Sequence, residues 1–256
     1  MTTSTYPDGI HHGIPFDEYL AISALSKSTL TEFGKGTPAE YHHRPPRVPS
    51  AAMNLGSLVD DMISGDDGKD YTVPPALEYR SKKDKAVWYQ WAADHGVKEP
   101  DGRRKDDLIA AVGEAGALVV EAADYDKAQA IVEALRNNER AAELIAGRPQ
   151  VSVITTDDDT GATIKTRPDF VHDGPRPLLV DLKTTANPDP AEFLRIARRF
   201  RYDVQAAMYS DAYQREADSR RPEFVFVVAP TTDPIIPERV ALYDLPQMTI
   251  DAARRW

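Results

Sequence analysis

The chain of 256 residues contains no cysteine. This absence excludes disulfide bonds, thiol catalysis, zinc sites built from cysteine and iron–sulfur clusters held by thiolates. No apolar stretch approaches the ~18 residues that a membrane-spanning helix needs. Residues 1–5 lack the charged start and the hydrophobic stretch of a secretion signal. We therefore expect a protein that stays in the cytoplasm and has no membrane partner.

Positive charge is also in short supply, with 31 Lys and Arg against 41 Asp and Glu, and a net charge of −10. A protein that coats nucleic acid through bulk charge depends on clustered Lys and Arg. The composition therefore argues against that class. A hydrophobic content of 41% and a mean hydropathy of −0.48 are typical of a water-soluble globular protein.

One short apolar run carries two charged side chains at a spacing of two. Residues 178–184 are apolar and rich in branched side chains, which indicates a strand. Because side chains alternate between the two faces of a strand, Asp181 and Lys183 point to one face. Val180 and Leu182 point to the other face, toward a core. Backbone geometry thus holds a carboxylate and an ammonium group side by side.

A second acid precedes this strand. Residues 162–167 alternate between small or apolar and polar side chains, and Pro168 suits the end of a strand. The turn-forming residues 172–177 then predict a hairpin between the two runs. Such a hairpin brings Asp169 close to Asp181.

Two converging carboxylates repel each other, and a divalent cation relieves this repulsion. Ligands that are all oxygen favour Mg²⁺ or Mn²⁺ over zinc. A metal so placed lowers the pKa of bound water and neutralises a phosphate, while Lys183 orients that water or stabilises developing negative charge. Asp-x-Lys on a strand is also common as a solvated face or an ion pair.

Three motifs in order give a more specific signal. Arg167-Pro168-Asp169, Asp181-Leu182-Lys183-Thr184-Thr185 and Gln205-Ala206-Ala207-Met208-Tyr209 together resemble the PD-(D/E)xK nucleases of the exonuclease VIII (RecE-type) and RecB-like group. The resemblance extends to helix starts at residues 26–28 and 55–57 and to the apolar run 224–228. It covers residues 20–245, with 97–116 as an insertion. Relatives that carry an iron–sulfur cluster are a poorer match, because this chain has no cysteine to hold one.

The resemblance implies a role for each matching residue. Asp169 and Asp181 correspond to acidic metal ligands, the carbonyl of Leu182 to a main-chain ligand, and Lys183 to the catalytic lysine. Gln205 and Tyr209 lie four apart on one helix face, and similar proteins use them near the active site and the DNA strand. The alternative for that pair is a polar helix residue and a half-buried tyrosine.

The sequence departs from the family pattern at one position. Relatives commonly have a histidine metal ligand four residues after the glycine of the Leu-Gly helix, and here Asp60 follows Gly56 at that spacing. Aspartate is an acceptable hard ligand for Mg²⁺, so a working site with an altered metal preference is expected. Asp61 points about 100° away around the helix and is a poorer candidate.

Contacts with DNA are expected from a few cations. Arg195, Arg198 and Arg199 lie three or four apart and share one helix face, so they are candidate phosphate contacts, with a solvated face as the alternative. Lys27 at a helix start and Arg167 beside the first acid are further candidates.

Together these observations predict one nuclease domain over residues 1–256 with an α/β fold. An extended arm (1–24) and a mainly helical part (25–146) precede the catalytic sheet and its flanking helices (147–256). The expected core is a restriction-endonuclease-like mixed sheet flanked by helices.

The resemblance implies a Mg²⁺-dependent exodeoxyribonuclease. It would resect linear double-stranded DNA ends in the 5′-to-3′ direction, supply single strands to a single-strand annealing recombinase, and form a homo-oligomer. The alternatives are an endonuclease or Cas4-like end processor without an iron–sulfur cluster, and a catalytically impaired DNA-binding or assembly subunit.

Overall fold

The computed structural model describes residues 6–45, 49–65 and 71–255. Their contacts divide the chain into two compact units, one comprising Met1–Asp66 and Ile131–Trp256 and the other Asp67–Ala130, as far as these ranges are described. Within the described ranges, every helix is too short or too polar to cross a lipid bilayer. The predicted division into one nuclease domain stays a prediction.

A five-stranded mixed sheet forms the centre of the first unit. The strands β8 and β9 run parallel to each other, whereas the other neighbours pair antiparallel. Asp181 of β8 lies opposite Phe226 of β9, and Lys183 opposite Val228. The strands, in sheet order, are β10 (Ala241–Tyr243), β9 (Glu223–Pro230), β8 (Leu178–Thr185), β7 (Phe170–His172) and β4 (Arg148–Pro149).

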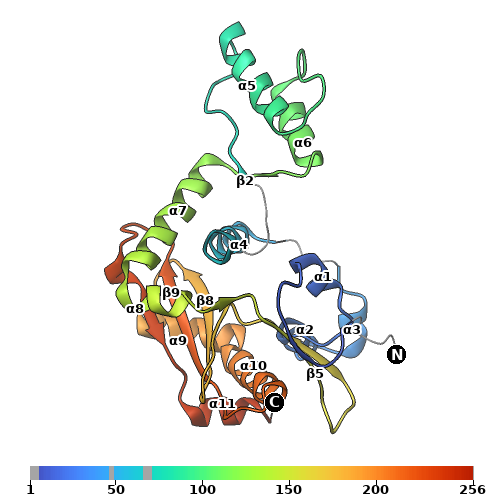
Figure 1. The fold of residues 1–256 in the computed structure, drawn as a ribbon, viewed down its shortest axis with the longest axis vertical. Coiled ribbons are helices and arrows are strands. Elements are labelled where there is room, and N and C mark those ends of the chain that lie inside the picture. The colour runs from blue at the N-terminus through green and yellow to red at the C-terminus, as the bar shows by residue number, and fades with distance from the viewer. Residues whose placement is uncertain (1–5, 46–48, 66–70, 256) are drawn as a thin grey trace. The chain divides into compact units, whose positions relative to one another are not determined.

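Helices cover both faces of this sheet (Figure 1). On one face, α10 (Tyr202–Glu216) packs in the same apolar cluster as Leu179, Phe224 and Phe226. On the other, α4 (Ala51–Ser64) lies against the side chain of Thr184. Coverage of both faces agrees with the sequence of β9, which is a nearly continuous apolar run after Glu223.

The remaining helices of this unit follow the sequence signals closely. Asp189 caps α9, whose first residue is proline, and Ser26 caps α2, both through side-chain bonds to the backbone. The helices are α1 (Phe16–Ala21), α2 (Lys27–Phe33), α3 (Pro38–His42), α8 (Glu139–Ile145), α9 (Pro190–Phe200), α11 (Gln247–Ala253) and the 3₁₀ turn η1 (Pro237–Arg239).

The expected hairpin has a different partner. The run that precedes Asp169 forms β6 (Thr163–Thr166), but this strand belongs to a separate three-stranded sheet with β5 (Ser152–Thr156) and β1 (Gly9–His11). The strand that pairs with β8 is β7, which begins only after Asp169. The prediction of a hairpin between residues 162–167 and 178–184 was therefore wrong, although the turn at 173–177 was placed correctly.

The N-terminal segment is held to the small sheet by buried cations. Lys165 is 6% exposed, and its Nζ donates to the carbonyls of Tyr19 (2.9 Å), Leu20 (2.9 Å) and Ile22 (2.8 Å) at the end of α1. The carbonyls of Tyr19 and Ile22 also accept backbone N–H groups, so the ammonium group adds charge-assisted hydrogen bonds at this helix end. Within the predicted extended arm over residues 1–24, Gly9–His11 form the strand β1, which pairs with β5, whereas Phe16–Ala21 form the helix α1 instead of extended chain.

The second unit has its own apolar core. It contains α5 (Lys82–Asp94), α6 (Lys105–Glu114) and a parallel pair of two-residue strands, β2 (Tyr71–Thr72) and β3 (Leu118–Val119). Trp88 and Leu108 are fully buried between the two helices. The chain returns to the first unit along α7 (Ala122–Asn137), within which the boundary between the units falls. The predicted helical part 25–146 is thus shared between two units.

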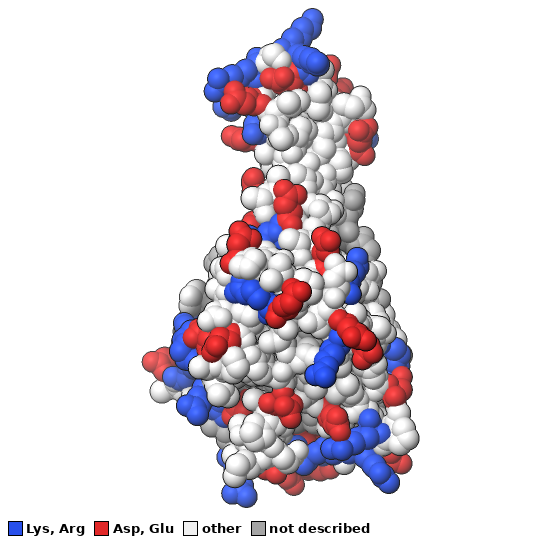
Figure 2. All heavy atoms as spheres, turned by 90° about the vertical axis from the view of Figure 1, so that its left-hand side faces the viewer, with Lys and Arg blue, Asp and Glu red and all other residues white. Residues whose placement is uncertain are grey.

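Charged side chains are mixed over the face of the molecule drawn in Figure 2. Lys and Arg lie among Asp and Glu on this face instead of forming one continuous basic area. This distribution agrees with the net charge of −10, and it directs the search for a DNA-binding surface to local features.

Replacing the buried lysine tests the anchoring of the N-terminal segment. Lys165→Met removes the three charge-assisted hydrogen bonds that its ammonium group donates to the end of α1. We expect a loss of about 2–4 kcal/mol in the free energy of unfolding, measured by urea denaturation. The exposed Lys98→Met is the matched control, and a loss below about 0.5 kcal/mol, as surface substitutions give, would contradict this structural role.

Candidate active site

Asp181 is the centre of the candidate site. This carboxylate lies on the central strand β8 and is only 2% exposed. Lys183 forms an ion pair with its Oδ2, and Gln205 on α10 donates to its Oδ1 through Nε2. A buried carboxylate is costly unless it is paired and hydrogen-bonded, and these two partners meet that need.

Asp169 reaches the same place from a loop between β6 and β7. Its Oδ2 accepts a hydrogen bond of 2.6 Å from the backbone N–H of Leu182, the residue between Asp181 and Lys183. The structure therefore places Asp169 beside Asp181, even though the strand before Asp169 lies in another sheet. The Nζ of Lys183 lies 3.4 Å from the carbonyl of Leu182, so the proposed main-chain ligand belongs to this group.

Asp60 is presented to the site by α4. A Cβ atom added at Gly56, one helical turn before it, would lie 3.3 Å from Oγ1 of Thr184 on β8. The absence of a side chain at Gly56 thus permits α4 to approach the strand next to Lys183. Asp60 is close enough to Asp169 for its charge to raise the pKa of that carboxyl group.

The charges in this group shift each other's protonation. Burial raises the pKa of Asp169 well above its ordinary range, and the negative charges of Asp60 and Asp181 raise it further. Burial alone would lower the pKa of Lys183, but Asp181, Tyr202 and Asp169 raise it above the ordinary lysine value. At neutral pH, Lys183 is therefore a cation that donates hydrogen bonds rather than a general base.

A cavity of about 550 Å³ opens onto this group. Gln205 and Tyr209 both line it, as their spacing of four on one helix predicted, and Lys183 lies at its wall. Burial raises the pKa of Tyr209, so its hydroxyl stays protonated. Of the described residues, the lining comprises Lys27, Ser28, Thr31, Glu32, Gly34, Lys35, Lys183, Arg199, Phe200, Arg201, Tyr202, Gln205 and Tyr209.

The cations expected to contact DNA occupy different places. Lys27 and Arg199 line the cavity. Arg195 instead pairs with Glu192 (Nη2 to Oε1, 2.5 Å), and Arg198 lines a separate hollow beside Leu245. The three arginines, although they share a helix face, therefore do not line one common ligand site.

Arg167 is buried and forms hydrogen bonds within the protein. Its side chain is 6% exposed, and it donates to the carbonyl of Ile14 (2.8 Å) and to Oε1 of Gln150 (2.8 Å). These bonds join the N-terminal segment to the strand before Asp169. The predicted contact of Arg167 with DNA stays a prediction that this burial disfavours.

The cavity also contains residues that the sequence motifs did not identify. They include Lys35, just after the end of α2, and the consecutive Phe200, Arg201 and Tyr202 at the junction of α9 and α10. The sequence signal that could have identified the last three is a junction between two helices at which two aromatic residues flank an arginine.

The donor set fits a hard divalent cation. Asp60, Asp169, Asp181 and the carbonyl of Leu182 offer only oxygen, the ligand type that Mg²⁺ and Mn²⁺ prefer. Burial is the first cause of the raised pKa of Asp169, and the charges of Asp60 and Asp181 raise it further; a cation would relieve this second contribution. Over residues 6–45, 49–65 and 71–255, no group of three or more acidic or histidine side chains is already arranged around one metal position, and the ammonium of Lys183 lies on Asp181.

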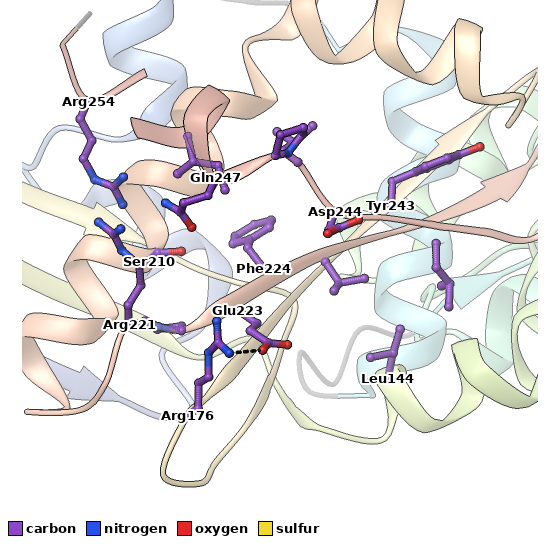
Figure 3. A pocket seen from close by; sticks show the side chains of 16 residues that line it. Leu144, Arg176, Ser210, Arg221, Glu223, Phe224, Tyr243, Asp244, Gln247 and Arg254 are labelled. Carbon is purple, nitrogen blue, oxygen red and sulfur yellow. Dashed lines mark ion pairs between the residues drawn. The ribbon is translucent and has the colours of Figure 1, made fainter. Parts of the chain in front are cut away.

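A second cavity, of about 490 Å³, lies elsewhere in the first unit (Figure 3). Arginines line it, but each has acidic partners. Arg176 pairs with Glu223 at 2.8 Å, and Arg221 and Arg254 both pair with Asp251. None of the residues predicted to act in catalysis lines this cavity, so it is not the candidate active site.

Comparison with known proteins agrees with this geometry. The family model of the PDDEXK-like domain of unknown function (DUF3799) matches residues 26–255. No curated protein matches the chain. A protein from Eubacterium rectale, whose crystal structure is described as a "putative exonuclease", aligns with a TM-score of 0.57 and 16% identity over 91% of this chain and 76% of its own.

A second solved structure, described as SSO0001, aligns at 12% identity over 87% of this chain and 85% of its own. Its TM-score of 0.31 is too low to support an argument about the fold.

The raised pKa of Asp169 predicts how stability depends on pH without metal. The folded protein holds this proton more tightly than the unfolded chain, whose aspartates titrate near pH ~3.9, so stability falls as pH rises through the raised pKa. Asp169→Asn keeps an oxygen acceptor for Leu182 N–H but cannot ionise. We expect it to be more stable than the unmodified protein at pH 8 in a chelator, with a difference that shrinks toward pH 4.

Urea midpoints at several pH values measure this difference. Asp159→Asn, in an exposed turn, is the matched control and should give no such trend. A stability difference for Asp169→Asn that stays constant from pH 4 to pH 8 would show that Asp169 is not strained by its neighbours.

Proposed function

Because the chain belongs to the family of the PDDEXK-like domain of unknown function (DUF3799), we propose that it is a divalent-metal-dependent deoxyribonuclease. The proposed substrate is linear double-stranded DNA, degraded from its ends in the 5′-to-3′ direction. The observation that supports it most strongly is the meeting of Asp169, Asp181 and Lys183 in one group, of which Lys183 lines the cavity. These are the acids and the lysine from which the family takes its name.

The residues that would hold the metal are Asp169, Asp181 and the carbonyl of Leu182, with Asp60 as a further oxygen ligand. When bound, Mg²⁺ or Mn²⁺ supplies a Lewis acid that polarises the phosphate and lowers the pKa of water. A third acid, Asp60 in place of histidine, makes the set wholly oxygen-based. This composition supports a preference for hard cations over zinc.

Lys183 would stabilise the negative charge that develops on the phosphate during hydrolysis. Its raised pKa keeps it protonated, and its place beside Asp181 and Leu182 fixes it next to the reacting group. Gln205 orients the carboxylate of Asp181 through its amide. Tyr209, protonated and in the same wall, can donate a hydrogen bond to the bound strand.

The cavity itself is suited to a polyanion. Besides Lys183, four cations line it, namely Lys27, Lys35, Arg199 and Arg201, whereas Glu32 is the one acid among the described lining residues. Phosphate contacts of this kind position a nucleic acid without reading its sequence. Action at DNA ends is supported by the resemblance to exonuclease VIII and by the description of the Eubacterium rectale structure.

Two partners complete the proposal. A nuclease that resects one strand leaves single-stranded DNA, which a single-strand annealing recombinase would take up. A homo-oligomer is proposed on the same resemblance, because ring-forming relatives thread DNA.

Removing the central residues tests the proposed activity. End-labelled linear duplex should lose nucleotides in Mg²⁺ and stay intact in a chelator. Asp181→Ala and Lys183→Ala should each lower the rate by about 10²–10³-fold or more, because each removes a group that stabilises charge in the transition state. Asp159→Ala, an exposed acid, is the control and should retain the full rate.

Covalently closed circles separate the possible outcomes of this assay. An end-dependent enzyme leaves circles intact, whereas cleavage of circles would identify an endonuclease. DNA binding without release of nucleotides in either Mg²⁺ or Mn²⁺ would exclude the nuclease and indicate a DNA-binding subunit.

The arginines of α9 test the path of the strand. Arg199 lines the cavity, whereas Arg195 pairs with Glu192 outside it. Arg199→Ala should weaken DNA binding and reduce the slope of log affinity against log salt by about 1, as expected when one phosphate contact is lost. Arg195→Ala on the same helix should leave that slope unchanged. Equal effects of the two substitutions would refute this path.

A further inference from the structure

Three aromatic rings form a stack that runs from the core to the surface at the active-site cavity. Phe226 on β9 is fully buried, Tyr202 is 8% exposed and Phe200 is 46% exposed. The rings of Phe226 and Tyr202 lie 5.2 Å apart at an interplanar angle of 20°, and those of Tyr202 and Phe200 lie 6.3 Å apart at 22°. Each ring is therefore nearly parallel to the one below it, and the series ends at the exposed ring of Phe200.

The backbone holds this outer ring in place. Phe200 is the last residue of α9, and Tyr202 the first of α10. Arg201 between them takes the left-handed conformation (φ 54°, ψ 56°), which is costly for a residue with a side chain. Its guanidinium is fixed by Asp203, with Nε 3.0 Å from Oδ1. A large apolar side chain at such a turn would ordinarily point inward, yet Phe200 lines the cavity.

Lysine and arginine side chains lie beside the stacked rings, where they could bind the phosphates of a strand. The Nζ atoms of Lys183 and Lys27 lie 5.3 Å and 5.5 Å from the centre of the Tyr202 ring. The guanidinium carbon of Arg199 lies 5.3 Å from the centre of the Phe200 ring. An exposed aromatic ring with neighbouring cations is the combination that binds single strands, since bases stack on the ring and cations bind phosphates.

We propose that Phe200 is a stacking site for an unpaired nucleobase of the strand that enters this cavity. The inference rests on the proposed function only in assuming that the cavity accepts a nucleic acid strand. A base paired within a duplex has neighbouring bases on both faces, so the ring of Phe200 selects a base that has left the helical stack. The site therefore binds the strand without regard to its sequence.

A paired binding experiment tests this site in the full chain. A labelled oligothymidylate is compared with an abasic oligomer of the same length, which has the same phosphates and no bases. With divalent ions chelated, the unmodified protein should bind the oligothymidylate about 5- to 100-fold more tightly. Phe200→Ala should lose most of this preference while its affinity for the abasic oligomer stays the same. Phe200→Trp should retain the preference.

Leu194→Ala is the matched control, because Leu194 is a similarly exposed apolar residue of α9 (49%) that does not line this cavity. It should leave the preference for bases intact. A Phe200→Ala variant that keeps the full preference, or an unmodified protein that has none, would overturn the stacking site.

Cleavage of linear duplex in Mg²⁺, measured on the same preparations, separates this inference from the proposed activity. A preference for bases that depends on Phe200, without any hydrolysis, would reject the nuclease and keep the stacking site. Hydrolysis together with a base preference that does not depend on Phe200 would do the reverse.

Discussion

The close approach of two carboxylates, one buried and one half-buried, is the constraint on which the rest of the site depends. Asp181 is almost inaccessible on a central strand, and Asp169 is held beside it by the N–H of Leu182. Such an arrangement costs folding free energy unless cations and hydrogen-bond donors offset it. The donors come from Lys183 on the same strand and Gln205 on α10. A stable position for both carboxylates therefore requires β8, its neighbour strand and α10 to be in place together, with α4 close against the opposite face.

Much of this arrangement could be predicted from local periodicity. Alternation along β8 placed Asp181 and Lys183 on one face, and a spacing of four placed Gln205 and Tyr209 on one face of α10, because both patterns depend only on backbone geometry. The partner of β8 could not be predicted in the same way. The strand β7 has only three residues, too few for an alternating pattern, so the longer run before Asp169 was assigned in its place. The division into two units could not be predicted for a related reason, because helical periodicity does not show which helices pack together.

The basic residues show a different limit of sequence reasoning. Arg195, Arg198 and Arg199 do share a helix, and Arg195 pairs with Glu192 on that helix. What Arg198 and Arg199 contact depends on the neighbouring elements, which the sequence pattern does not specify. Arg198 faces a hollow beside Leu245 near the start of α11, whereas Arg199 reaches the cavity shared with α2. Arg167 is a predicted DNA contact because it lies next to Asp169 in the sequence. Its side chain is buried, however, and donates a hydrogen bond to the carbonyl of Ile14 in the N-terminal segment. Contacts between residues far apart in the sequence decide both cases.

The catalytic group and the surface beside it are built on one apolar framework. Phe226 lies opposite Asp181 in the parallel pair of strands, so the two side chains occupy the same face of the sheet. The ring of Tyr202 stacks on Phe226 and lies beside Lys183, which links the outward series of rings to the ammonium group of the site. A displacement of Phe226 would therefore move the lysine and the exposed ring of Phe200 together. Because interiors are close-packed, the distance between Lys183 and the proposed strand-binding surface is set by the core rather than by a flexible loop.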